Sequence, residues 1–142
     1  MKRTSRFLVG LAVVGLVLGG CSQTTTTTST EKAITIEEQA SGLKQLTLSA
    51  KAAERLGVAT AAVTTAGSTL TIPYAAVIYD SQGATWAYVN TGPLVFLRET
   101  ISIQEVGGDT AVLSAGPASG TMVVTTGAAE LYGAETGVGG GR

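Results

Sequence analysis

The chain has 142 residues, nine Lys and Arg against ten Asp and Glu, no His and one Cys. Without imidazole there is no Ser-His-Asp or Cys-His nucleophile system and no His-ligated metal, and one cysteine forms neither an internal disulfide nor a thiolate cluster. A net charge of −1 gives nucleic acid no basic surface to bind. The composition therefore predicts a binding or scaffolding protein that is not an enzyme and holds no cofactor.

Residues 1–20 have the pattern of a secretory signal peptide. Three basic residues precede the apolar run 7–18, which is shorter than the ~20 residues that a membrane-spanning helix needs. The run ends in Leu-Gly-Gly before Cys21, which resembles the bacterial lipobox, whose cysteine receives a diacylglycerol thioether and, after cleavage, an N-acyl chain such as palmitate. We therefore predict a lipoprotein anchored through Cys21 in a membrane of the cell envelope, with its domain on the extracytoplasmic side. An ordinary signal peptide, or a short anchor with an incidental cysteine, is the alternative.

The remaining chain divides into three parts by composition. Residues 21–32 are rich in Thr, so we expect a solvated tether. Residues 133–142 contain five Gly and are expected to be a disordered tail. The ordered domain is therefore predicted to span 33–132.

The first half of this domain reads as strands around one short helix. Apolar residues alternate with polar ones at 34–36 and 45–48, which predicts two half-buried strands. Ser49 is a predicted N-cap and Gly57 a predicted left-handed C-terminal cap of the helix between them. Residues 58–63 then return to extended structure.

A hairpin and further strands are predicted in the second half. Residues 69–79 lead into Asp80-Ser81-Gln82-Gly83, a favourable type I turn, and 84–90 form the return strand. On that strand Trp86 and Tyr88 share one face. Three more strands are predicted, at 94–103, 110–113 and 121–126. We therefore expect a mostly β fold, a small antiparallel barrel or sandwich of about six or seven short strands with one short helix.

Two stretches of the domain carry a family resemblance. Leu46–Val63 reads "strand, short helix, Leu-Gly-Val, strand", and Ile72–Val89 reads "Pro-x-x-Ala-Val", a turn and "Trp-x-Tyr-Val", with "Val-Val-x-x-Gly-Ala" following from Val123. These stretches resemble the periplasmic adaptor subunits, or membrane fusion proteins, of resistance-nodulation-division (RND) and heavy-metal efflux pumps. The likeness is to the membrane-proximal domain, because residues 64–68 join the stretches where full adaptors insert a lipoyl-like domain, a coiled-coil hairpin and a β-barrel domain.

The resemblance implies a function in transmembrane transport through protein contacts. We expect an accessory or adaptor module for an exporter, with the lipid bilayer and an inner-membrane efflux transporter or a full-length adaptor as partners. The alternative is a free-standing envelope lipoprotein that binds a small ligand or an envelope component on the same β-scaffold.

Few side chains are candidates for a specific site. Met122 lies on a predicted core strand, and a single thioether cannot enclose a soft metal ion, so we predict no metal site. Residues 116–120 lack the Lys-Ser/Thr pair of a phosphate-binding loop and are predicted to form a turn. Trp86 and Tyr88 are the predicted partner contacts if they are exposed, since such residues dominate interface hot spots. Arg98 is expected to have no special role.

Overall fold

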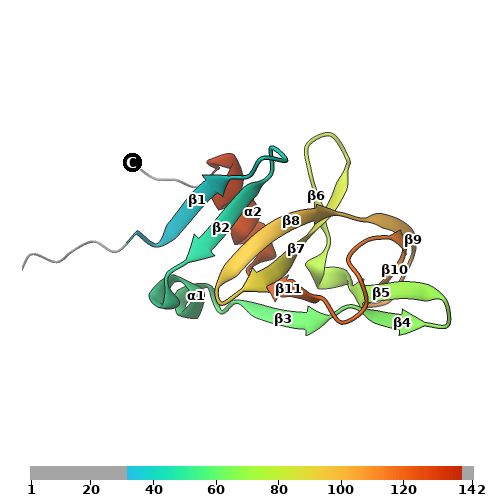
Figure 1. Ribbon diagram of the computed structural model, residues 1–142. Helices are drawn as coiled ribbons and strands as arrows, with labels where there is room; N and C mark the ends of the chain where they lie inside the picture. The colour runs from blue at the N-terminus through green and yellow to red at the C-terminus, as the bar shows by residue number, and fades with distance from the viewer. Residues whose placement is uncertain (1–31, 139–142) are drawn as a thin grey trace, which may run out of the picture.

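The computed structural model describes residues 32–138 (Figure 1). The predicted signal peptide 1–20, the tether 21–32 apart from its last residue, and the lipidation site Cys21 lie outside the described residues. The expected fold class is confirmed, because two antiparallel sheets pack against each other in a mostly β, sandwich-like structure that does not close into a barrel. The strands are shorter and more numerous than the sequence indicates.

The larger sheet has the strand order β1-β2-β8-β7-β11-β3, and β6 pairs with β7 beside this path. Every printed pairing in it is antiparallel. Its strands are β1 Ile34–Glu38, β2 Lys44–Leu48, β3 Ala59–Ala62, β6 Ile78–Tyr79, β7 Thr85–Gly92, β8 Val95–Thr100 and β11 Met122–Thr126.

The smaller sheet has the order β4-β5-β10-β9 and receives the chain twice from the larger one. It consists of β4 Thr64–Ala66, β5 Thr69–Pro73, β9 Ser102–Gly107 and β10 Thr110–Ala115. The chain passes between sheets at Val63 (β3 to β4) and at Ile101 (β8 to β9), and these residues are 1% and 2% exposed. Each crossing is thus held by a buried β-branched side chain, as at the corners of packed sheets.

Both faces of the larger sheet are buried, so the molecule has two core clusters. Between the sheets lie Ala87, Val89 and Val123, among others. On the opposite face, Tyr88 and Val124 pack with residues of the two helices. Because successive strand residues alternate between faces, burial of both faces explains why residues 86–89 of β7 are apolar without interruption.

The first helix, α1 Ala50–Leu56, begins after the predicted N-cap Ser49 and ends at the predicted C-terminal cap Gly57. The Ser49 hydroxyl accepts the Ala52 N–H at 3.2 Å, and Gly57 adopts a left-handed conformation with φ 60°. A side chain at Gly57 would be strained in this conformation, which explains the glycine. A short 3-10 helix, Tyr74–Ala76, lies between β5 and β6.

The second helix, α2 Ala128–Thr136, overturns the predicted boundary of the domain. The sequence predicts a disordered tail from 133. Instead the helix continues through Gly133 and buries Glu135, which is 5% exposed. Residues 139–142 of the expected tail lie outside the described residues. The helix covers one face of the larger sheet, where its Ala128 and Leu131 join the second core cluster.

Two predicted strands are each divided. The strand expected at 69–79 is split into β5 and β6, which lie in different sheets, so only β6 forms the predicted hairpin with β7. Its turn is confirmed by the Gly83 N–H, which donates to the Asp80 carbonyl at 3.0 Å. The strand expected at 94–103 is divided at Ile101 into β8 and β9, because the chain changes sheet there.

Candidate functional site

The two predicted contact residues, Trp86 and Tyr88, differ in their exposure to solvent. Trp86 is half-buried, and its role as a contact stays a prediction. Tyr88 is 0% exposed, so it does not meet the condition of exposure under which the sequence predicts a partner contact. Both side chains lie on the same face of β7, as predicted, but this face is covered by α2 at Tyr88.

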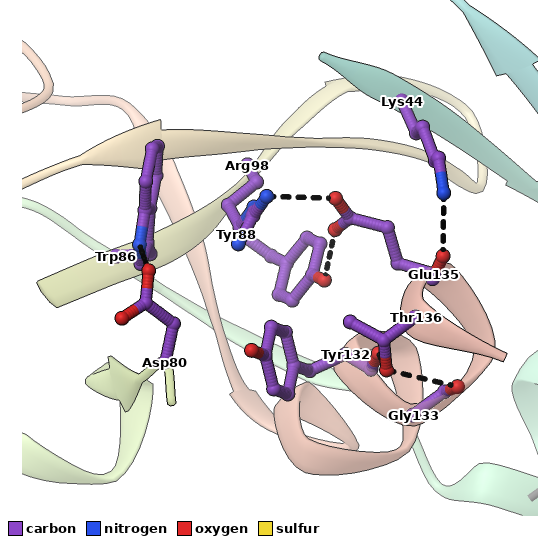
Figure 2. A network of polar contacts seen from close by, with 9 residues as sticks. All are labelled: Lys44, Asp80, Trp86, Tyr88, Arg98, Tyr132, Gly133, Glu135 and Thr136. Carbon is purple, nitrogen blue, oxygen red and sulfur yellow. Dashed lines mark hydrogen bonds and ion pairs between the residues drawn. The ribbon is translucent and has the colours of Figure 1, made fainter. Parts of the chain in front are cut away.

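The residues on this face belong to a buried polar network centred on Glu135 (Figure 2). Arg98 on β8 forms an ion pair with Glu135, with 3.0 Å between Nη2 and Oε1. Tyr88 donates its hydroxyl to the other carboxylate oxygen. Lys44 on β2 donates to the Glu135 carbonyl at 3.0 Å, which places a positive charge at the C-terminal end of α2, where the helix dipole favours it.

Arg98 also lies between two aromatic rings. Its guanidinium carbon is 4.2 Å from the centre of the Trp86 ring and 5.7 Å from the centre of the Tyr132 ring. A guanidinium at such distances is attracted by the π face. Arg98 therefore joins β7, β8 and α2, and the expectation that it has no special role is wrong.

A carboxylate on the β6–β7 turn fixes the orientation of Trp86. Asp80 Oδ2 accepts the Trp86 indole N–H at 3.0 Å, and Oδ1 accepts the backbone N–H groups of Gln82 and Ala84, each at 2.9 Å. The Trp86 hydrogen bond, helped by the two backbone N–H groups, lowers the pKa of Asp80 below its usual 3.8. Because the bonds stabilise the ionised carboxylate, the turn is tightest when Asp80 is charged.

Burial governs the protonation of Tyr88. Removal from water, followed by the hydrogen bond to Glu135, raises the pKa of the phenol far above its usual 10.0. The phenol therefore stays protonated and acts as a permanent donor. The network thus attaches α2 to the larger sheet, because the buried Glu135 carboxylate is held by the Arg98 cation and the Tyr88 hydroxyl.

A separate hollow lies between β3 and β5, and none of its lining residues belongs to the polar network around Glu135. It has a volume of about 440 Å³, and its walls include Ala61, Ala62 and Thr64 on one side and Ile72, Pro73 and Asp109 on the other. The Thr64 and Thr71 hydroxyls are 2.7 Å apart at its closed end, where β4 pairs with β5. We call this hollow the β3–β5 groove.

Within 32–138, no three or more His, Cys, Asp or Glu side chains gather as a metal-binding group. No helix in that same range is both long and apolar enough to cross a bilayer.

Sequence reasoning missed Arg98, Lys44 and Glu135 as a set. Glu135 lies in a Gly-rich stretch whose composition is typical of a disordered tail, and its partner Tyr88 is 47 residues away in the chain. An available signal was the helical segment 128–136 itself, in which Ala128, Leu131 and Glu135 recur at helical spacing. The exposed aromatic residues, Tyr74 at 39% and Tyr79 at 51%, were likewise not chosen as contacts.

Comparisons of the chain with models of known protein families, with curated proteins and with solved structures returned no match. The resemblance to efflux-pump adaptors therefore depends on the two sequence stretches described above.

Proposed function

We propose that this protein is a membrane-anchored lipoprotein that acts as an accessory module for a transmembrane exporter, through protein contacts. One observation carries the proposal beyond the sequence motifs. In the larger sheet, β2 and β3 of the first stretch lie on either side of β8-β7-β11, in which β7 and β11 carry motifs of the second stretch and β8 lies between those motifs in the chain. The first stretch thus frames the second on both sides, as expected for a membrane-proximal domain whose strands come from both ends of an adaptor.

The surface of the domain suits contact better than chemistry. Tyr74 and Tyr79 present their hydroxyls side by side, 3.4 Å apart, on the outside of the molecule. Their hydrogen bond raises the pKa of Tyr79, so the phenol of Tyr79 stays protonated at ordinary pH. Amphipathic rings of this kind are frequent at protein interfaces. The second function predicted from the sequence, binding of a small ligand, stays a prediction.

The anchor and the partner are tested in one experiment. A photo-crosslinking amino acid at Tyr79, which is half exposed, is expected to capture an integral transporter subunit in cells. The same position in a Cys21→Ala chain is expected to lose the membrane location and the crosslink together, with no labelled fatty acid on the protein. Crosslinking at Gln104, an exposed position on β9 in the smaller sheet, serves as the control and should not capture the transporter subunit.

Two outcomes would contradict the proposal in different ways. Membrane attachment that survives Cys21→Ala would remove the lipid anchor. A lipidated protein whose exposed positions crosslink no transporter subunit, but which binds a small ligand, would favour the alternative function.

A further inference from the structure

Each of the two strands in residues 59–66 is paired along one edge only. β3 pairs with β11, and β4 pairs with β5. The Val63 N–H donates to the Thr121 carbonyl and the Val63 carbonyl accepts from the Gly120 N–H, both at 2.8 Å, so the backbone groups of Val63 point toward the segment that leads into β11. Successive residues of a strand direct their backbone groups to opposite sides. Thr60 and Ala62 on β3 therefore direct their N–H and C=O groups away from β11.

No strand of the described chain pairs with β3 on that open side. β5 pairs with β4 as far as the Thr64–Thr71 pair. Beyond this point β5 follows β10, with Ile72 opposite Ala111 and Pro73 opposite Thr110. The β3–β5 groove lies where the two strands separate, and Ala62 forms part of its wall. An open strand edge and a groove therefore occur at the same place.

Little protects the β3 edge itself, because the register shift in its pairing with β11 lies on the β11 side, between Val124 and Thr126. Its sequence is Ala-Thr-Ala-Ala, without charge or proline, and three of its four residues are exposed. Natural proteins usually guard such edges with charged residues, proline or bulges. Two other edge strands of the described sheets show this protection, because β1 ends in Glu37 and Glu38, and β9 carries Glu105 and pairs irregularly with β10.

The groove indicates the chemistry of an occupant. Its walls are mostly small or hydroxyl-bearing side chains, which leave room for β-branched residues beside β3. Its one charged lining residue is Asp109, which is exposed and forms no ion pair with any other described residue. A basic side chain in the occupant would complement this carboxylate.

We propose that the open edge of β3 accepts an extended segment of a partner protein as an additional strand, with β-branched side chains in the β3–β5 groove and a Lys or Arg beside Asp109. Backbone hydrogen bonds to Thr60 and Ala62 supply general affinity, and the groove supplies selectivity, as in other cases of strand addition. This mode of binding goes beyond the proposed function and does not require the partner to be an exporter.

A selection of random octapeptides on the full, processed chain tests the proposal. Enriched peptides are expected to contain β-branched residues and a basic residue. Ala62→Pro removes the outward N–H without removing a bond to β11, and binding should weaken at least about tenfold, or by about 1.4 kcal/mol. Asp109→Asn should weaken binding of the basic peptides and leave their uncharged analogues unchanged.

A second edge variant and a control keep the test independent of folding. Ala62→Lys is the second edge variant, for the case in which Ala62→Pro disturbs the domain. It should also weaken binding, because Lys guards an edge without removing its N–H. Gln104→Lys on the edge strand β9 is the matched control and should bind as the parent does, and the Trp86 fluorescence of every variant should match that of the parent.

Two results would overturn the inference. One is a set of selected peptides whose affinity is the same for the parent and both Ala62 variants. The other is a concentration-dependent dimer that Ala62→Pro abolishes, which would make a second copy of this chain the occupant.

Discussion

At the scale of single residues, Glu135 is the most consequential side chain of the described structure. It is 5% exposed and is held by Arg98 and by Tyr88. A carboxylate in such surroundings needs both partners, because an ion removed from water without compensation is costly. The same argument applies to Arg98, whose side chain is 17% exposed.

Glu135→Gln is predicted to destabilise the domain by about 3 kcal/mol. The amide keeps the size of the side chain but leaves the Arg98 charge without its counter-ion. The measurement is the urea midpoint of unfolding. Glu130→Gln, at an exposed position of the same helix, is the control and should change stability by less than about 0.5 kcal/mol. Equal effects of the two substitutions would show that the ion pair does not hold α2.

Asp80 gives a prediction about acid. Its pKa is lowered in the folded protein, chiefly by the Trp86 indole N–H, so its contribution to stability is complete above the ordinary Asp pKa and is lost as pH falls through the lower folded value. The chain has one Trp, so the indole N–H gives one NMR resonance. That resonance should titrate with a midpoint below 3.8, and in Asp80→Asn the acid transition should vanish. A midpoint at or above 3.8 would contradict the hydrogen bond.

At the scale of elements, α2 is attached to the sheet by both apolar and polar contacts. Leu131 is 0% exposed in the second core cluster, and Lys44 and Glu135 anchor the end of the helix. Position 133 within the helix is a glycine because the Cβ atom of any other residue would lie 2.8 Å from the Val138 carbonyl oxygen. The helix is therefore part of the folded domain.

Leu131→Ala is predicted to cost about 2–5 kcal/mol, because it leaves a cavity between α2 and the sheet. Val138→Ala, at a residue that is 75% exposed, is the control and should leave stability nearly unchanged. Thermal unfolding followed by far-ultraviolet circular dichroism measures both variants. If Leu131→Ala were as stable as the control, the helix would not be packed on the sheet.

Elements whose signals are local could be predicted from the sequence. The Ser49 and Gly57 caps of α1 depend on residues a few positions apart. The alternation of Ile34 and Ile36 with polar residues predicted the strand β1, which the structure pairs with β2, with Ile34 opposite Leu48 and Ile36 opposite Leu46. The turn from Asp80 to Gly83 was equally legible, because its hydrogen bonds join residues within four positions.

At the scale of the whole molecule, the sequence was insufficient wherever distant contacts decide the structure. The change of sheet at Ile101 has no local marker, since the apolar pattern runs on from β8 into β9. The polar network likewise unites residues of β2, β7, β8 and α2, so its members could not be recognised as a site. Tyr88 shows the consequence: an aromatic residue suited to an interface is instead sealed beneath a helix whose composition suggested disorder.

The position of β1 has a mechanical consequence. It is the first described strand, it lies at the border of the larger sheet, and its partner within that sheet is β2 alone. A pull on the N-terminus would therefore act on the hydrogen bonds between β1 and β2 alone. These bonds would break one after another, starting at the Ile34–Leu48 end. β2 would resist more strongly, because it is bonded to β8 as well. Such a pull would therefore break the hydrogen bonds between β1 and β2 before it disturbed the rest of the sheet.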